Sequence, residues 1–93
     1  MVVGVLQLRL AIREAQSLKD KRQVVKSLRD RIRNEFNVSA AEVDALDLRQ
    51  TAVLGVTLAT NDRVFADQVL AKVVDFVRRS PAAQLVDYEI EIL

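Results

Sequence analysis

Residues 17–33 read SLKDKRQVVKSLRDRIR, and their spacing predicts an amphipathic helix with two adjacent stripes. At about 100° per residue, five of the seven cations in this stretch fall on one side of the helix, at successive spacings of 3, 4, 3 and 4. We call these five residues the basic stripe: Lys19, Arg22, Lys26, Arg29 and Arg33. The apolar stripe beside it consists of Leu18, Val25, Leu28, Ile32 and Phe36. The basic stripe is therefore expected to flank the helix face that packs on a core.

The other two cations, Lys21 and Arg31, lie off the basic stripe. The helical angle of Lys21 places it on or near the apolar side, so we expect it to snorkel at the helix start or to pair with an acid such as Asp47. Ser17 is a plausible N-cap, and Asp20 follows it three residues later as an imperfect capping box. The helix is therefore expected to begin at residue 17 and to run to about Phe36.

The segments on either side of this helix alternate between strand and helix patterns. Alternating apolar residues predict strands at Val3–Ile12, Glu42–Arg49, Ala52–Thr60 and Val86–Ile92. A second helix, capped by Thr60 or Asn61, is expected to run to Arg79 before Ser80 and Pro81 stop it. Its predicted apolar face consists of Phe65, Val69, Val73, Phe76 and Val77.

The resulting order, β-α-β-β-α-β, predicts one domain over residues 1–93 of the α+β class. Two similar β-α-β halves favour the ferredoxin-like arrangement, a four-stranded antiparallel sheet with two helices on one face. We expect the spatial strand order 4-1-3-2. The opposite sheet face is then open and carries Val3, Val5, Val53, Gly55, Thr57 and Ala59, mixed with Gln7 and Arg9. Such a face invites a protein partner or a second copy of the chain, unless it is simply a solvated, semi-apolar surface.

The amino-acid composition excludes several kinds of catalytic and metal-binding chemistry. The chain has no cysteine and no histidine, which excludes disulfides, thiol nucleophiles and imidazole chemistry. No recognisable base accompanies a serine or threonine, and no metal site or cofactor is expected. A small phosphatase that uses Arg13 is a further hypothesis, but no glycine-rich phosphate loop accompanies that residue. No run of 18 apolar residues occurs, so no membrane-spanning helix is expected, and the alternating start is typical of a strand rather than a signal peptide.

The net charge of +1 conceals an uneven distribution. Residues 1–33 carry nine cations and three anions, whereas residues 34–93 carry five cations and ten anions. This split either provides one face for an anionic partner or lets two halves of a small domain complement each other.

Two modes of nucleic-acid binding are open to this fold class. Stacking of bases on the sheet needs aromatic residues on the central strands, and the two central strands carry none. The electrostatic mode needs a cationic surface, which the basic stripe supplies, with Arg13 or Arg9 as extensions. The alternative is a solvated helix flank whose long side chains cover apolar surface. We therefore identify Lys19, Arg22, Lys26, Arg29, Arg33 and Arg13 as candidate phosphate-binding residues.

Several segments also resemble the YlxP-like family, small bacterial proteins with a domain of unknown function. They are Met1–Leu6, Ser17–Arg22, Phe36–Ser39, Ala41–Asp44, Asp47-Leu48 with Gln50, Thr60–Arg63 and Glu89–Ile92. Arg49 departs from the aromatic residue expected there in many relatives. The resemblance implies the ferredoxin-like fold and a cytoplasmic bacterial protein. Genes of this family often lie among genes for translation and ribosome maturation, which implies a role near RNA or the ribosome.

Two functional hypotheses result. The first is a non-enzymatic domain that associates with RNA or the ribosome through the basic stripe. The second is a protein-interaction or homodimerisation module that uses the open sheet face. The two can coexist, because a dimer would double the basic stripe.

Overall fold

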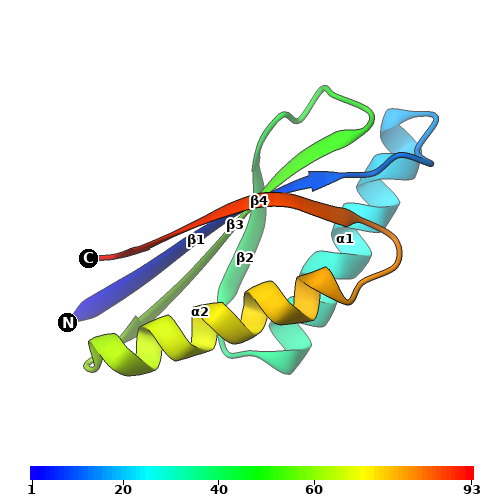
Figure 1. The fold of residues 1–93 in the computed structure, drawn as a ribbon. Helices are drawn as coiled ribbons and strands as arrows, with labels where there is room; N and C mark the ends of the chain where they lie inside the picture. Colours follow the sequence, from blue (N-terminus) through cyan, green and yellow to red (C-terminus); the bar gives the residue numbers. More distant parts are fainter.

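The computed structural model describes residues 1–93, which form four strands and two helices (Figure 1). In chain order they are β1 (Val2–Ala11), α1 (Leu18–Glu35), β2 (Ser39–Asp44), β3 (Thr51–Thr60), α2 (Arg63–Arg78) and β4 (Gln84–Ile92). Neither helix combines the length and the apolar character that a membrane span needs.

The strands form one antiparallel sheet in the order β2-β3-β1-β4. Both helices cover the same face of the sheet and leave the other face open (Figure 1). Strand β1 lies in the middle and pairs with β3 from Val2↔Thr60 to Ala11↔Thr51. The predicted ferredoxin-like fold and strand order are thus confirmed.

The core fills the space between the sheet and the helices. Leu6, Leu8 and Leu10 point from β1 into it and are fully buried. A Cβ atom added at Gly4 would lie 2.9 Å from Leu58 Cδ2 and 3.0 Å from Leu70 Cδ1. Helix α2 therefore packs so closely on the start of β1 that a side chain there would displace its neighbours.

Two predicted boundaries were wrong. Strand β2 covers Ser39–Asp44 rather than Glu42–Arg49, because the chain turns away from the sheet at Ala45, whose φ of 58° is left-handed. Helix α2 is capped by Asp62, not by Thr60 or Asn61. The Asp62 carboxylate accepts hydrogen bonds from the amides of Val64 and Phe65, at 2.9 and 3.2 Å.

The predicted apolar face of α2 was right except at Phe65: Val73 and Val77 are buried, and Val69 and Phe76 pack against the core. The buried residues of this helix are Ala66, Leu70, Val73, Val74 and Val77, whereas Phe65 is 50% exposed. Ala66 has a small side chain that lets α2 approach the sheet closely. A sequence pattern based on large apolar side chains overlooks such a residue.

Strand β4 carries a bulge that the alternation of its sequence hides. Its register with β1 shifts between Arg9 and Leu10, so that Leu10 pairs with Leu85. Leu85 consequently packs against the core, while Val86 is exposed. Beyond the bulge, Ile90 and Ile92 face the core as predicted.

Candidate nucleic-acid interface

The basic stripe lies on the flank of α1 that faces away from α2. The helix buries Lys21, Val25, Leu28 and Ile32. On one side of this buried face, Arg31 donates a hydrogen bond to Ser80 Oγ at 3.1 Å, beyond the end of α2. On the other side, Arg33 of the stripe donates to the carbonyl oxygen of Ala40 in β2 at 2.7 Å. The stripe therefore runs beside β2, at one edge of the sheet.

Three members of the stripe have no partner within the chain. The side chains of Lys19, Arg22 and Lys26 are exposed and form neither an ion pair nor a hydrogen bond within the chain. Arg29 is half-buried and lies 3.3 Å from the Asp30 carboxylate. From Lys19 to Arg33 the stripe extends about 21 Å along the helix axis. It thus offers three free cations, with two partly engaged ones toward its C-terminal end.

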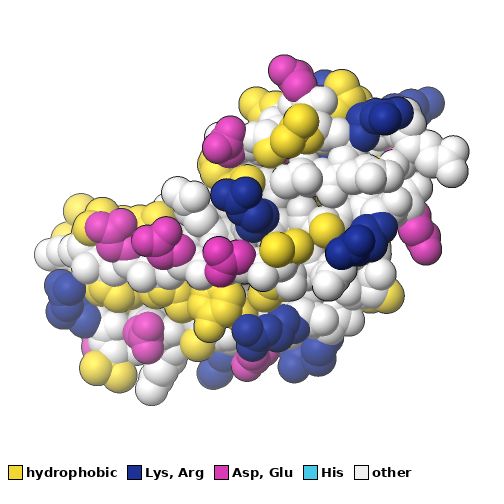
Figure 2. All heavy atoms as spheres, turned by 45° about the horizontal axis from the view of Figure 1, so that its top comes forward, with side chains coloured by type: hydrophobic (Ala, Val, Ile, Leu, Met, Phe, Trp, Pro, Cys, Tyr) yellow, Lys and Arg dark blue, Asp and Glu magenta, His cyan; other side chains and the backbone are white.

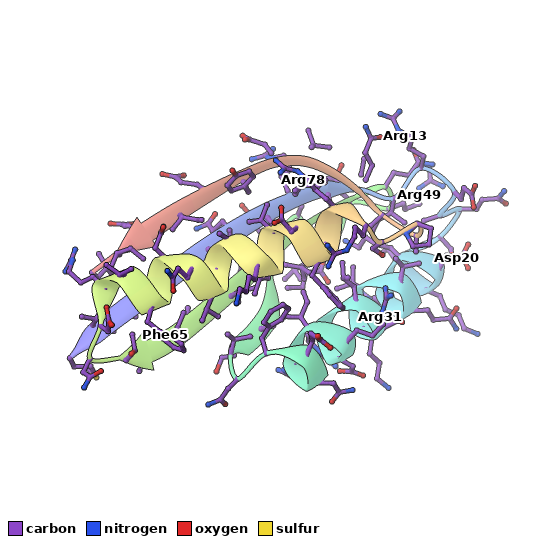
Figure 3. The ribbon with its side chains drawn as sticks, turned by 60° about the horizontal axis from the view of Figure 1, so that its bottom comes forward. Arg13, Asp20, Arg31, Arg49, Phe65 and Arg78 are labelled. Atoms are coloured by element: carbon purple, nitrogen blue, oxygen red, sulfur yellow. The ribbon has the colours of Figure 1, made fainter.

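Other cations proposed as extensions of the stripe lie elsewhere. Arg13 donates from Nε to Gln84 Oε1 at 2.9 Å, so it lies toward β4, at the sheet edge opposite β2. Figure 3 shows Arg13 at the end of the sheet and Arg31 on α1. Arg9 lies on the open sheet face, paired in register with Asp87. The stripe is therefore a helix flank by itself and is not joined to Arg9 or Arg13.

Lys21 is fully buried and does not snorkel. Its ammonium lies 2.9 Å from Glu42 Oε2. It donates to the carbonyl oxygens of Ala45, Leu46 and Thr51 at 2.8, 3.1 and 3.3 Å. The expected pairing with Asp47 is wrong, because β2 ends early and directs Glu42 toward the helix. A buried charge needs such a set of acceptors, so Lys21 fixes the turn between β2 and β3.

Hydrogen bonds tie this turn to the segment that precedes α1. Gln50 donates from Nε2 to the carbonyl oxygens of Arg13 and Ala15 at 3.0 and 3.1 Å. Ser17 Oγ accepts from the Asp20 amide at 3.0 Å, as its predicted N-cap role requires. Asp20 accepts in turn from the amide of Gln16, at 3.1 Å. The segments Ser17–Arg22, Ala41–Asp44 and Asp47–Gln50 therefore converge at one end of the molecule and have structural roles there.

Sequence reasoning missed the pair of Lys21 and Glu42. A signal was present, since Lys21 lies one turn before Val25 on the buried side of the helix. Its partner could not be found in this way, because Glu42 was expected near the start of a strand that in fact ends two residues later.

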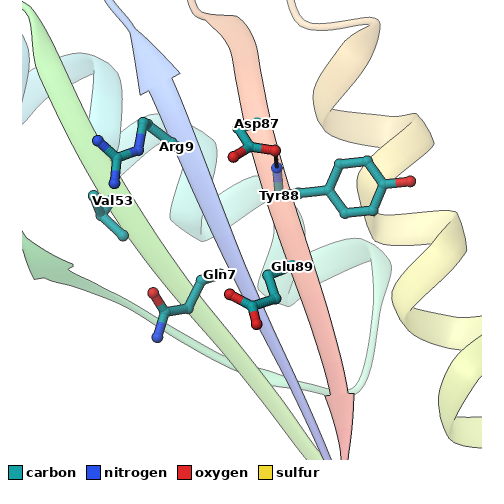
Figure 4. Close-up of a pocket in the computed structure, with 6 residues that line it drawn as sticks. All are labelled: Gln7, Arg9, Val53, Asp87, Tyr88 and Glu89. Carbon is teal, nitrogen blue, oxygen red and sulfur yellow. Dashed lines mark hydrogen bonds between the residues drawn. The ribbon is translucent and has the colours of Figure 1, made fainter.

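The open sheet face has an acidic border. Asp87, Glu89 and Glu91 of β4 pair in register with Arg9, Gln7 and Val5 of β1. Figure 2 shows acidic side chains in a row along this strand. A shallow hollow lies between Gln7, Arg9, Val53, Asp87 and Glu89, while Tyr88 points away toward α2 (Figure 4). The face thus changes from acidic at β4 to largely uncharged at β3.

Comparisons with known proteins agree on the family and the fold. A family model described as "Protein of unknown function (DUF503)" matches residues 3–90. The "Uncharacterized protein YlxP" of Bacillus subtilis (strain 168) is 32% identical over 80 residues, which cover 86% of this chain and 87% of that protein. A de novo designed protein with a ferredoxin fold, solved by NMR, is similar with a TM-score of 0.56 at 12% identity, over 99% of this chain and 85% of the designed one. This last likeness concerns the fold alone. The chain belongs to the DUF503 family of proteins of unknown function.

Proposed function

We propose that the protein is a non-enzymatic domain that binds RNA through phosphate contacts made by the basic stripe. The observation that carries the proposal is the set of three exposed, unpartnered cations on one helix flank, Lys19, Arg22 and Lys26. Phosphates are the natural complement of such a surface, and contacts to them position a nucleic acid without reading its sequence.

The placement of the aromatic residues supports contacts to the backbone rather than to bases. Phe36 and Phe76 pack edge to face against each other, with ring centroids 5.7 Å apart. The Tyr88 ring lies 5.5 Å from the Arg78 guanidinium carbon, on the helix side of the sheet. The open face consequently has no aromatic ring on which a base could stack. The remaining aromatic residue, Phe65, is 50% exposed but belongs to α2.

The stripe also carries a stability penalty. Arg22 and Lys26 are four residues apart on the same helix, and a like-charge pair at this spacing destabilises a helix by about 0.2–0.5 kcal/mol. Asp30, four residues after Lys26, instead pairs with Arg29 at 3.3 Å and leaves Lys26 unpaired. Retaining repulsive neighbours on an exposed flank is consistent with a role in binding an anion.

Titration of a fluorescent RNA at several salt concentrations tests the proposal. Log affinity should fall by about 0.7–0.9 for each decade of salt and for each phosphate neutralised. The double variant R22E/K26E should bind more weakly and show a shallower slope. Absence of RNA binding at low salt, or an unchanged slope in R22E/K26E, would contradict the proposal.

The chain offers a matched control in K72E/R79E. Lys72 and Arg79 are exposed and lie in and just after α2, away from the stripe. This variant has the same net charge as R22E/K26E but leaves the stripe intact. It should keep most of the affinity and the wild-type slope, which separates a local contact from a general effect of net charge.

A further inference from the structure

We propose that the open sheet face binds a second copy of this chain across a two-fold axis that runs parallel to the strands. In this dimer β4 of each copy lies over β2 of the other, and Glu89 and Glu91 meet Arg33 of the partner copy. The proposal does not depend on RNA binding.

The two edges of the open face differ in charge. On the β4 edge, Asp87, Glu89 and Glu91 point to the open side, since they alternate with Ile90 and Ile92 of the core. At the β2 edge, Arg33 borders a shallow apolar hollow formed with Ala41, Val43, Gly55 and Thr57. Arg33 comes from α1 on the other side of the sheet and reaches this edge at Ala40. An acidic edge and an edge with one cation, Arg33, thus bound the same face.

This difference selects one of two symmetric ways to stack two such faces. A two-fold axis across the strands would place β4 over β4 and bring two acidic rows together, which is repulsive. An axis along the strands reverses the order β2-β3-β1-β4 in the second copy. It places β4 over β2 and β1 over β3, so that Glu89 and Glu91 of the acidic row meet the edge that carries Arg33, while Asp87 lies level with Asp44. Such an interface uses the same patch on both copies and closes as a dimer.

The register of the strands places Glu89 and Glu91 at the same position along the strand direction as Arg33; we call this position the height. Glu91 and Glu89 pair with Val5 and Gln7 of β1. Those two residues pair with Thr57 and Gly55 of β3, which in turn pair with Ser39 and Ala41 of β2. Ala40, whose carbonyl oxygen holds Arg33, lies between these last two. An axis along the strands keeps this height, so Glu89 and Glu91 fall on either side of the partner copy's Arg33.

The centre between the charged edges is mixed. Val5 is half-buried and Val53 is buried, while Gln7 and Arg9 of β1 are exposed. Apolar surface is added at the β2 edge by Val43, which is 52% exposed and covers Gly55. Strands β1 and β3 have ten residues, β4 has nine and β2 has six. At about 3.3 Å per residue and a spacing of about 4.8 Å, they outline a face of roughly 550 Å². A standard interface buries about 800 Å² per partner. The face therefore suits a modest dimer whose charged edges set its orientation.

Sedimentation of the full chain over a range of concentrations tests the dimer. We expect the wild-type protein to dimerise and E89R/E91R to raise the dissociation constant about tenfold or more, since like charges would then meet Arg33. R33E should weaken the dimer as well. The combined variant R33E/E89R/E91R restores opposite charges and should recover most of the affinity.

A strictly monomeric wild-type protein would overturn the proposal, as would R33E/E89R/E91R dimerising no better than both parent variants. The matched control is D67R/D75R, which reverses two exposed acids on α2 and should leave the dissociation constant within about twofold. Because E89R/E91R alters only exposed side chains on an edge strand, it tests the interface even if R33E disturbs the contact with Ala40.

Discussion

Lys21 and Lys26 lie five residues apart on α1, yet one belongs to a buried region and the other to a solvent-exposed surface. Lys21 is fully buried among Glu42 and three backbone carbonyl groups. Lys26 is exposed on the basic stripe and has no partner within the chain. The buried region uses its cation to hold the turn between β2 and β3, whereas the stripe leaves its cations available. The number of cations in a helix therefore does not indicate how many can bind a partner until each cation is assigned to a buried or an exposed face.

The largest effect is expected at the buried cation. Lys21→Met removes the partner of Glu42, whose side chain is 14% exposed, and leaves three carbonyl oxygens without their donor. Breaking a buried ion pair in this way typically costs about 3–5 kcal/mol. Chemical denaturation should show this loss in the free energy of unfolding. Lys26→Met is the control and should change it by less than about 0.5 kcal/mol, so equal effects would erase the distinction between the two regions.

Gln50→Ala tests the same end of the molecule with a smaller expected loss. The side chain donates to the carbonyl oxygens of Arg13 and Ala15 at 3.0 and 3.1 Å. Removing these two hydrogen bonds should lower the free energy of unfolding by about 1–2 kcal/mol. Gln68→Ala, on the exposed side of α2, should be nearly neutral. If Gln50→Ala left the free energy of unfolding unchanged, the turn would be held by Lys21 alone.

The helix cap should contribute slightly less. Ser17 Oγ accepts a hydrogen bond from the Asp20 amide at 3.0 Å, and replacing such a cap with alanine costs about 1 kcal/mol. Ser27→Ala is the matched control, since Ser27 is exposed within the same helix and alanine is the better helix former. Thermal unfolding should separate the two variants, and a Ser27→Ala loss as large as that of Ser17→Ala would contradict the capping role.

The smallest expected effect is a gain in stability rather than a loss. Arg22→Glu places a carboxylate four residues before Lys26 and converts a repulsive pair into an attractive one. The helix should gain about 0.4–1 kcal/mol, the repulsion removed plus the attraction gained, measurable as a small rise in the melting temperature. RNA affinity should fall at the same time. A variant that lost both stability and affinity would indicate that Arg22 has a structural role like that of Lys21.

The sequence predicted the fold more fully than the site. Alternation in β1 and the stripes of α1 were sufficient because their apolar residues are large and regularly spaced. The end of β2 could not be predicted, since it depends on a left-handed Ala45 held from a distant helix by Lys21. The bulge opposite Arg9 and Leu10 was equally hidden, because β4 alternates without interruption. At the site, helical angles located the basic stripe, but its separation from Arg13 required the contact with Gln84.

The salt dependence of RNA binding tests the central claim most directly. Measured for the wild-type chain, R22E/K26E and K72E/R79E, the slope should become shallower by about 1.4–1.8 in R22E/K26E alone, since two phosphate contacts are removed. Equal slopes in the three proteins, or a wild-type chain that does not bind RNA at low salt, would show that the stripe is only a solvated helix flank.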